Sequence, residues 1–237
     1  MKIGGIQKLT LIDYPGFTAC IVFLSGCNFR CPWCHSPELV IPEVISDHPE
    51  ISEKEILSFL DKRKGLLDGV VICGGEPTVN RDLPQLLKKI KDIGFKIKLD
   101  TNGSNPAMLG DLISRKLIDY IAMDIKAPFS SLKDIQKYTK IVGVKIKLKE
   151  IKDSIKIIKV SGIDYEFRTT VIPSLHTKED IKTIAKMISP AKKYFIQRFR
   201  PNKNINSYFH NLSPYSENFM DDIVKEIKVF FDTCESR

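Results

Sequence analysis

The sequence lacks the segments that would carry a protein into or across a membrane. No run of about eighteen apolar residues occurs, and no early stretch joins a basic start, an apolar run and a small-residue cleavage site. Hydrophobic residues make up 43% of the 237 residues, which is ordinary for a folded globule. We therefore expect a soluble, cytoplasmic protein with no membrane partner, and a core that needs no disulfide bonds.

Signals for nucleic-acid binding are also missing, although the chain is basic. The formal net charge is +8 and the pI is about 9.1, which can indicate a nucleic-acid partner. The lysines are spread through amphipathic segments such as residues 145–149, and there is no RNA-binding signature or basic tail. We interpret the charge as solvated helix faces and predict no nucleic-acid partner, with an acidic protein or a phosphate-bearing substrate as the alternative.

The chain also lacks an internal repeat and an inter-domain linker, so we expect one domain over residues 1–237. Continuous apolar runs predict six buried strands, at residues 17–25, 69–73, 95–99, 118–123, 165–172 and 194–199. Helical patterns are expected at residues 52–64, 82–93, 106–116, 131–138, 147–160, 177–188 and 216–231. The remaining segments are a short edge strand within residues 6–12, an irregular stretch at 36–51 and a polar loop at 201–214.

This alternation of strands and helices predicts an α/β fold with a parallel sheet and right-handed crossovers. Six βα units are fewer than the eight that close a barrel. The expected architecture is therefore a partial (β/α)6 TIM-like barrel, an open three-quarter barrel with parallel strands.

What the sequence does contain is a cluster of three cysteines after the first buried strand. Cys27, Cys31 and Cys34 have the spacing C-x3-C-x2-C, and thiolates are ligands for soft metals. Three ligands leave one iron of a four-iron cluster without a protein partner, and an open metal position is typical of a catalytic site. We therefore predict a [4Fe–4S] cluster with a small cofactor on the open iron. No role is assigned to the three scattered thiols, Cys20, Cys73 and Cys234.

Three other interpretations of the cysteine loop stay open. Cys31 to His35 reads as C-x-x-C-H, a haem-attachment signal, but haem attachment generally needs export. Cys31 and Cys34 resemble a thioredoxin-type dithiol, which would leave Cys27 without a role. A structural zinc site would need His35 as its fourth ligand.

Polar residues are concentrated where the predicted strands end. Because the carboxyl ends of parallel strands share one rim, these side chains should meet at one pocket. Glycines permit close approach of the backbone to a ligand, so successive N–H groups there could hold an anion, and a neighbouring carboxylate could pair with an ammonium. Carboxylates after two further strands could share a hard cation, bind ribose hydroxyls or cap helices, while Lys and Arg would complement a ligand carboxylate. The residues are Gly74, Gly75, Glu76, Asp100, Thr101, Asp124, Lys126, Arg168, Gln197 and Arg198.

Taken together, these motifs resemble those of radical SAM enzymes. The cysteine motif has an aromatic residue, Trp33, just before its third cysteine, and residues 74–77 read Gly-Gly-Glu-Pro, similar to that family's motif for the methionine amino group. Residues 11–16, 100–103 and 123–126 resemble the glycyl-radical-enzyme activating type, most closely the anaerobic ribonucleoside-triphosphate reductase activating proteins.

The resemblance implies an oxidoreductase that cleaves S-adenosylmethionine (SAM) at the cluster with an electron from a flavodoxin or ferredoxin. The 5′-deoxyadenosyl radical would then take hydrogen from a glycine of a partner, a glycyl radical enzyme such as the anaerobic (class III) ribonucleotide reductase. The alternative is a radical SAM enzyme for a small molecule, similar to the pterin ring contraction of 7-carboxy-7-deazaguanine synthase. A third interpretation is an iron or redox sensor.

The resemblance also implies roles for single residues. Gly74, Gly75 and Glu76 would hold the methionine amino end of SAM, and Trp33 would lie against the adenine through its backbone. The methionine carboxylate and the ribose of SAM would be held by Asp124, Lys126 and Arg168. Activases of this type have a histidine after the sixth strand; here Gln197 or Arg198 is the expected substitute, because no histidine occurs there. The resemblance further implies a monovalent cation, bound by Asp100, Thr101, Met123 and Asp124. Thr101 is also expected to contact SAM.

Overall fold

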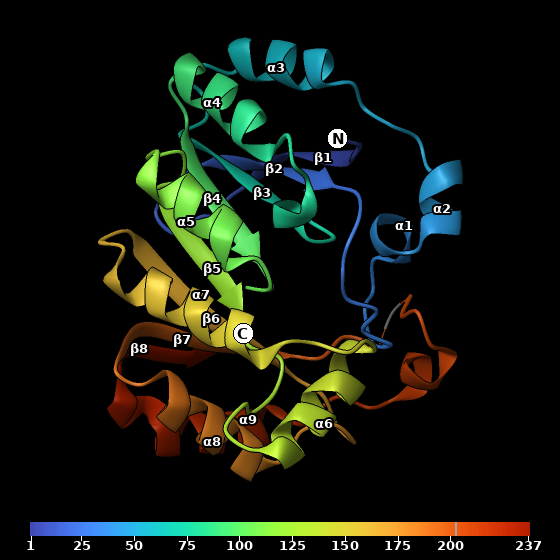
Figure 1. The fold of residues 1–237 in the computed structure, drawn as a ribbon, viewed down its shortest axis with the longest axis vertical. Coiled ribbons are helices and arrows are strands. Elements are labelled where there is room, and N and C mark those ends of the chain that lie inside the picture. The colour runs from blue at the N-terminus through green and yellow to red at the C-terminus, as the bar shows by residue number, and fades with distance from the viewer. Residues whose placement is uncertain (202) are drawn as a thin grey trace.

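In the computed structural model, which describes residues 1–201 and 203–237, eight strands form one curved sheet in sequential order (Figure 1). Strand β1 (Ile3–Thr10) lies at one edge and pairs antiparallel with β2 (Ala19–Leu24). The other strands each run parallel to the one before: β3 (Gly69–Gly74), β4 (Lys96–Thr101), β5 (Tyr120–Asp124), β6 (Asp164–Val171), β7 (Ala191–Arg198) and β8 (Phe231–Ser236). Within the described residues β1 and β8 do not pair, which confirms the predicted open barrel.

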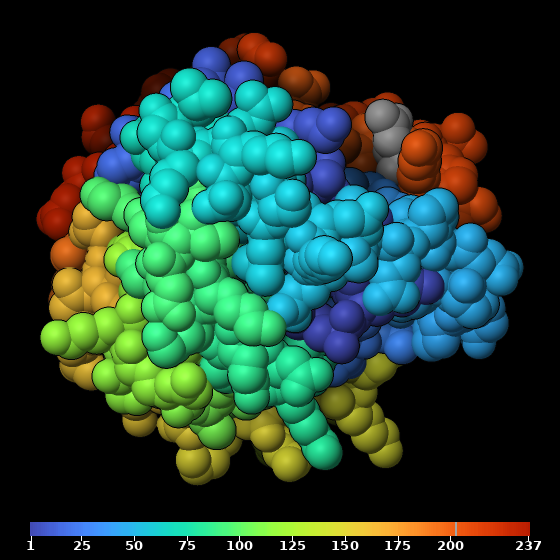
Figure 2. Space-filling model, turned by 90° about the horizontal axis from the view of Figure 1, so that it is seen from above, coloured from blue at the N-terminus to red at the C-terminus, as the bar shows by residue number. Residues whose placement is uncertain are grey.

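Helices cover the outer, convex face of the sheet (Figure 1). Figure 2, seen from above, shows the segments of α3 (cyan) and α4 (green) at the surface of this side. Their sequences favour these ends: α3 and α8 begin with complete capping boxes at Ser52 and Thr177, and α4 ends at Gly94 in the left-handed region. The helices are α3 (Glu53–Asp61), α4 (Leu83–Ile93), α5 (Pro106–Ser114), α6 (Leu132–Val142), α7 (Leu148–Val160), α8 (Lys178–Ile188) and α9 (Glu217–Ile227).

Two apolar clusters fill the molecule, one on each face of the sheet. The larger lies between the strands and the helices. The smaller lies on the concave face, near the amino ends of the strands, and consists of Tyr14, Ala19, Ile21, Val71 and Tyr120. This second cluster fills the barrel interior at the end away from the cysteine loop.

Two regions differ from the sequence expectation. The predicted helix at 216–231 ends at Ile227, and the chain then forms β8, a seventh parallel strand. Its sequence, FDTCES, has no fully buried position and lacks the apolar run that marks the inner strands. The stretch at 36–51, expected to be irregular, holds the short helices α1 (Pro37–Val40) and α2 (Pro42–Asp47), because a proline at the first helical position favours a helix start.

No helix in the described part of the chain is long and apolar enough to cross a bilayer. The polar loop predicted at 201–214 contains a short 3-10 helix, η2 (Ser207–Asn211). Residue 202 of that loop lies outside the described residues.

Candidate active site at the carboxyl ends of the strands

The cysteine loop leaves the end of β2 and is held on two sides by backbone hydrogen bonds. On one side the N–H of Arg30 donates to the carbonyl oxygen of Val142 at the end of α6, at 2.8 Å, and the Trp33 indole donates to that of Ile141 at 3.0 Å. Gly143 has φ +74, and a side chain there would lie 2.1 Å from the Arg30 carbonyl oxygen. The αL glycine that ends α6 therefore also lets the helix approach the loop.

On the other side, the segment 204–206 makes a hydrogen bond to each of three successive carbonyl groups of the loop. The N–H groups of Asn206 and Ile205 donate to the carbonyl oxygens of Pro32 and Cys34, at 2.8 and 2.9 Å. The side-chain amide of Asn204 donates to the carbonyl of Trp33 at 2.6 Å. Residues far apart in sequence thus fix the backbone that carries the three thiols (Figure 1).

Of the three thiols, that of Cys31 is buried and those of Cys27 and Cys34 are half-buried. Burial raises the pKa of Cys27 to about 11 and that of Cys31 to about 12, and each thiolate would further raise the pKa of its neighbours. The Lys126 ammonium acts in the opposite direction on all three. Three soft donors with a nearby compensating cation fit an iron–sulfur cluster, whose binding requires thiolates.

The arrangement does not fit a single metal ion. Among the described residues, no group of three or more His, Cys, Asp or Glu side chains could hold one. This disfavours the zinc interpretation with His35 as the fourth ligand. Each cysteine of a four-iron cluster binds a different iron, so its thiols need not converge on one point.

The turn after β3 packs tightly on the start of the cysteine loop. A side chain at Gly74 or Gly75 would lie 2.2 Å from the Leu24 carbonyl oxygen or 2.1 Å from that of Gly26. The N–H groups of Gly75 and Glu76 donate to these same oxygens, at 2.9 and 2.8 Å. The expectation that successive N–H groups here hold a ligand anion is therefore wrong at these two positions, because they hold the cysteine loop instead.

The Glu76 carboxylate is buried and accepts hydrogen bonds from the next strand end. Its Oε1 accepts from the Thr101 hydroxyl at 2.7 Å and from the N–H and hydroxyl of Thr78, and its Oε2 accepts from the Asn102 N–H at 2.6 Å. Burial raises the pKa of Glu76, partly offset by these donors. Glu76 and Thr101 therefore join the turn after β3 to the end of β4.

The charged residues predicted after β4, β5 and β6 form one network. Arg168 donates from Nη1 to Asp100 and from Nε to Asp124, both at 2.9 Å. The remaining carboxylate oxygens pair with Lys98 at 2.7 Å and Lys126 at 2.8 Å. Burial alone would raise the pKa of Asp124, but the ion pairs with Arg168 and Lys126 outweigh it and hold that pKa well below its ordinary value.

This pairing bears on the predicted monovalent cation. All four carboxylate oxygens of Asp100 and Asp124 have a Lys or Arg partner, so a cation would have to compete with three positive side chains. The Met123 side chain packs against the Gly103 turn. The cation stays a prediction, and its binding requires this network to rearrange.

A cavity of about 1230 Å³ opens beside these groups. Of the predicted site residues, Trp33, Arg168, Gln197 and Arg198 line it. The other predicted residues are not part of this lining: the three cysteines are on the cysteine loop, and the rest are at the carboxyl ends of β3, β4 and β5. Lys126 connects the two groups, because its ammonium lies 4.9 Å from the centre of the Trp33 ring while it pairs with Asp124.

Sequence reasoning missed several residues of the barrel interior. Glu166 on β6 is buried, accepts from the Tyr120 hydroxyl at 2.9 Å, and lies 3.9 Å from Arg168 and 3.8 Å from Arg237. Glu166 and Lys98 are charged residues within strands predicted to be buried, and that local mismatch was the available signal. Asn204 gave no signal, since its partner lies 171 positions away.

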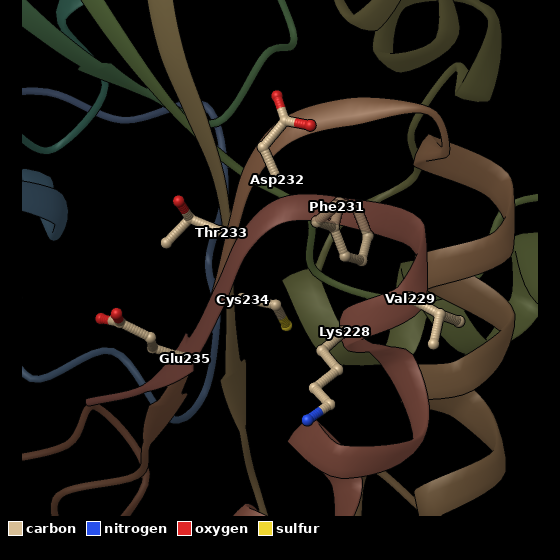
Figure 3. A pocket seen from close by; sticks show the side chains of 7 residues that line it. All are labelled: Lys228, Val229, Phe231, Asp232, Thr233, Cys234 and Glu235. Carbon is tan, nitrogen blue, oxygen red and sulfur yellow. The ribbon is translucent and has the colours of Figure 1, made fainter.

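A second cavity, of about 560 Å³, lies beside α9 and β8 (Figure 3). One continuous segment lines it, and Cys234 is its one thiol. Burial raises the pKa of Cys234 to about 12, so this thiol is a poor nucleophile at neutral pH. None of the predicted site residues contributes to this cavity.

Comparison with known proteins agrees with this geometry. A protein of Methanocaldococcus jannaschii named "Putative glycyl-radical enzyme activating enzyme" is 35% identical over 99% of this chain and 95% of its own length. The 7-carboxy-7-deazaguanine synthase of Thermococcus kodakarensis is 26% identical over 76% of this chain and 74% of its own.

Among solved structures, Streptococcus suis SuiB bound to precursor peptide SuiA has a TM-score of 0.68 and 13% identity, over 91% of this chain. The match covers 48% of SuiB, so this chain spans about half its length, and the likeness shows the fold alone. The family model "Radical SAM superfamily" matches residues 21–188, from within β2 to the end of α8. The chain therefore belongs to the radical SAM superfamily, whose members use a [4Fe–4S] cluster and S-adenosylmethionine.

Proposed function

We propose that the protein is a radical SAM activase that generates a glycyl radical on a partner enzyme, a class III ribonucleotide reductase. The observation that carries this proposal is the cavity beside Trp33 and Arg168. Its volume of about 1230 Å³ exceeds the roughly 300–1,000 Å³ of ordinary small-molecule sites. That volume leaves room for a segment of polypeptide beside the cofactor. The match to an activating enzyme over nearly the full length of both chains supports the same choice.

In this proposal, Cys27, Cys31 and Cys34 hold the cluster. When bound, the cluster and SAM together supply a carbon radical that removes a hydrogen atom from the substrate. The protein excludes water and keeps the thiol-bearing loop fixed. The two sets of hydrogen bonds to the loop, from α6 and from segment 204–206, perform that second task.

The remaining predicted residues bind and orient SAM. The positive side chains of Arg168 and Lys126 attract the carboxylate of the methionine moiety. Asp124 pairs with both and orients them. The carbonyl oxygens of Gly74 and Gly75 and the buried Glu76 take the amino end, with Thr101 holding Glu76 in place. The backbone of Trp33 contacts the adenine, and Gln197 and Arg198, which line the cavity, take the ribose side.

An external donor must supply the electron, and we propose a flavodoxin or ferredoxin. A cytoplasmic location and the absence of a nucleic-acid partner remain predictions of the same proposal. Both agree with a protein whose substrate is another soluble enzyme.

The proposal is tested by anaerobic mixing of the reconstituted protein with SAM, a reductant and a class III ribonucleotide reductase. Electron paramagnetic resonance should show a glycyl radical whose signal grows with SAM consumption. A control without SAM, and one with the reactive glycine of the reductase replaced by alanine, should show none.

A small-molecule substrate is the second candidate, favoured by the polar interior of the barrel. Lys98, Glu166 and Thr170 line the cavity together with Arg168, and an activase has no evident need for so many polar groups there. A deazaguanine-forming ring contraction would use such groups to bind a pterin. Turnover of a pterin substrate without a glycyl radical on any protein partner would select this function and overturn the first.

A further inference from the structure

Glu166 carries one carboxylate oxygen that no other described residue satisfies. The residue is 1% exposed, and it lines the large cavity. Its Oε2 accepts a hydrogen bond from the Tyr120 hydroxyl at 2.9 Å, whereas its Oε1 accepts none from the described part of the chain. A buried carboxylate oxygen without a donor is costly, so this arrangement points to a donor that a ligand supplies.

Two cations near Oε1 are too far away to satisfy it. The Nη1 atoms of Arg168 and Arg237 lie 3.9 and 3.8 Å from this oxygen, beyond hydrogen-bond distance. Arg168 already donates to Asp100 and Asp124.

The Arg237 guanidinium has donors to spare. It lies over the Phe195 ring, 3.4 Å from the ring centre, and donates no side-chain hydrogen bond to another described residue. The cavity therefore holds an unused acceptor, the Oε1 of Glu166, beside the unused donors of Arg237. We term these two groups the Glu166–Arg237 subsite.

The Glu166–Arg237 subsite lies next to a residue proposed to hold SAM. Glu166 and Arg168 are two positions apart on β6, so their side chains face the same side of the sheet. The backbone of Arg237 pairs with β7 at Ile196 and Arg198. A group bound at the subsite is therefore beside Arg168, and so beside the cofactor that Arg168 would hold.

An acceptor beside a donor selects a ligand with an N–H group next to a C=O group. A residue in extended conformation presents its own N–H and C=O on one side, as in the hydrogen-bonded pairs of an antiparallel sheet. The lactam edge of a pterin presents the same two groups. The polar groups of this cavity thus suit a peptide backbone as well as a small polar molecule.

We propose that the Glu166–Arg237 subsite binds the backbone of the protein substrate at its reactive glycine. Glu166 accepts from the N–H of that residue, and Arg237 donates to its C=O. This inference rests on the proposed function. A glycine has no side chain to recognise, so contacts with its backbone are the ones that can fix its Cα hydrogen beside the cofactor.

The test replaces Glu166 by methionine, which removes the acceptor, and uses Tyr120→Phe as a matched control. Tyr120→Phe removes the hydrogen bond to the other oxygen of the same carboxylate and leaves Oε1 in place. Glycyl radical formation is measured against the concentration of a class III reductase, and 5′-deoxyadenosine is counted per radical formed. Tyr120→Phe should leave both values close to those of the wild type.

Glu166→Met should need about tenfold more reductase for half-maximal radical, as expected when a hydrogen bond to a charged group is lost. It should also form more than one 5′-deoxyadenosine per glycyl radical, because a misplaced glycine lets the adenosyl radical react elsewhere. Glu166→Gln keeps an oxygen at this position and should recover part of the loss.

The iron–sulfur absorbance shows whether each variant folds and takes up the cluster. If Glu166→Met does not fold, Arg237→Met removes the donor of the subsite at a side chain that is 40% exposed. That variant should also raise the half-maximal reductase concentration and the deoxyadenosine count. Wild-type values for Arg237→Met would overturn the inference.

The outcomes distinguish the two proposals. If the wild type forms no glycyl radical on the reductase, the proposed function fails, and this inference fails with it; a raised KM of Glu166→Met for a pterin would then assign the subsite to the lactam edge. If the wild type forms the radical and Glu166→Met behaves like it, the function stands and the subsite is wrong. Equal effects of Tyr120→Phe and Glu166→Met would show that the carboxylate serves only packing, and would also overturn this inference.

Discussion

The cavity beside Arg168 and the cavity beside Cys234 differ mainly in how many parts of the chain build them. The larger, at about 1230 Å³, takes its lining from residues 12–13 after β1, the cysteine loop, β4, β6, β7, β8 and α9. The smaller, at about 560 Å³, is lined by residues of the single segment 228–235 (Figure 3). Parallel strands bring their carboxyl ends to one rim, so only the larger cavity can collect groups from many elements.

The charged residues beside the two cavities differ in how they are paired. Beside the larger cavity, Arg168 joins Asp100 to Asp124, and two lysines complete the network. At the smaller cavity, Lys228, Asp232 and Glu235 form no ion pair with another described residue. Paired, buried charge costs desolvation energy, and it is retained where a ligand must be oriented. The comparison therefore assigns the chemistry to one end of the barrel.

Replacing cysteines tests this assignment with the largest expected effect. Alanine at Cys27, Cys31 or Cys34 should abolish the iron–sulfur absorbance and the reductive cleavage of SAM, since in the proposed function each thiol holds one iron. Cys234→Ala, in the smaller cavity, should leave both unchanged. A triple alanine variant of the loop that still reconstitutes a four-iron cluster would show that the cluster lies elsewhere.

Removing Arg168 should have the next largest effect. Arg168→Met leaves two buried carboxylates without their shared partner, at a cost of about 3–5 kcal/mol in the free energy of unfolding. The affinity for SAM should fall as well. Arg115, whose pair with Asp111 is exposed, is the control, and Arg115→Met should change stability by less than about 1 kcal/mol. Equal losses in chemical denaturation would contradict a special role for the network.

The buried His176 gives a pH-dependent prediction. Burial lowers its pKa from 6.5 to about 4, so the unfolded chain takes up a proton first as the pH falls. The stability from neutral His176 is complete above about pH 6.5 and should decline by about 3 kcal/mol on going to pH 4. Urea titrations at several pH values should show this decline, and His176→Gln should lack that part of it. Parallel pH profiles for both proteins would refute the assignment.

The smallest effect is expected at Asn204. Its side chain donates to the Trp33 carbonyl, and Asn204→Ala should cost about 1–2 kcal/mol by leaving that oxygen unpaired. Trp33 is the one tryptophan in the chain, so its fluorescence reports on the cysteine loop. The emission should shift to longer wavelength as the loop loosens. As a control, Asn211→Ala, at an exposed position at the end of η2, should leave the emission unchanged.

The sequence predicted the features that local chemistry determines. Apolar runs marked all six inner strands, and Ser52 and Thr177 marked helix starts because capping needs only neighbouring residues. The cysteine spacing predicted the cluster ligands, which stay a prediction. Strand β8 was missed because an edge strand does not need two apolar faces, and α1 and α2 because prolines were read as breaks.

Long-range contacts could not be predicted from local pattern. The N–H groups of Gly75 and Glu76 hold the cysteine loop, and only the packing of β3 beside β2 determines this. The hydrogen bond from Asn204 to Trp33 and that from Tyr120 to Glu166 likewise depend on the tertiary structure. Local pattern therefore predicted single site residues in more detail than the contacts among them.

Mössbauer spectroscopy of protein reconstituted with ⁵⁷Fe tests the cluster and its open iron most directly. With Cys27, Cys31 and Cys34 as ligands, the spectrum should be that of a [4Fe–4S] cluster, and added SAM should change the signal of one iron while leaving the other three. A mononuclear iron spectrum, or a four-iron spectrum that SAM does not alter, would contradict the account.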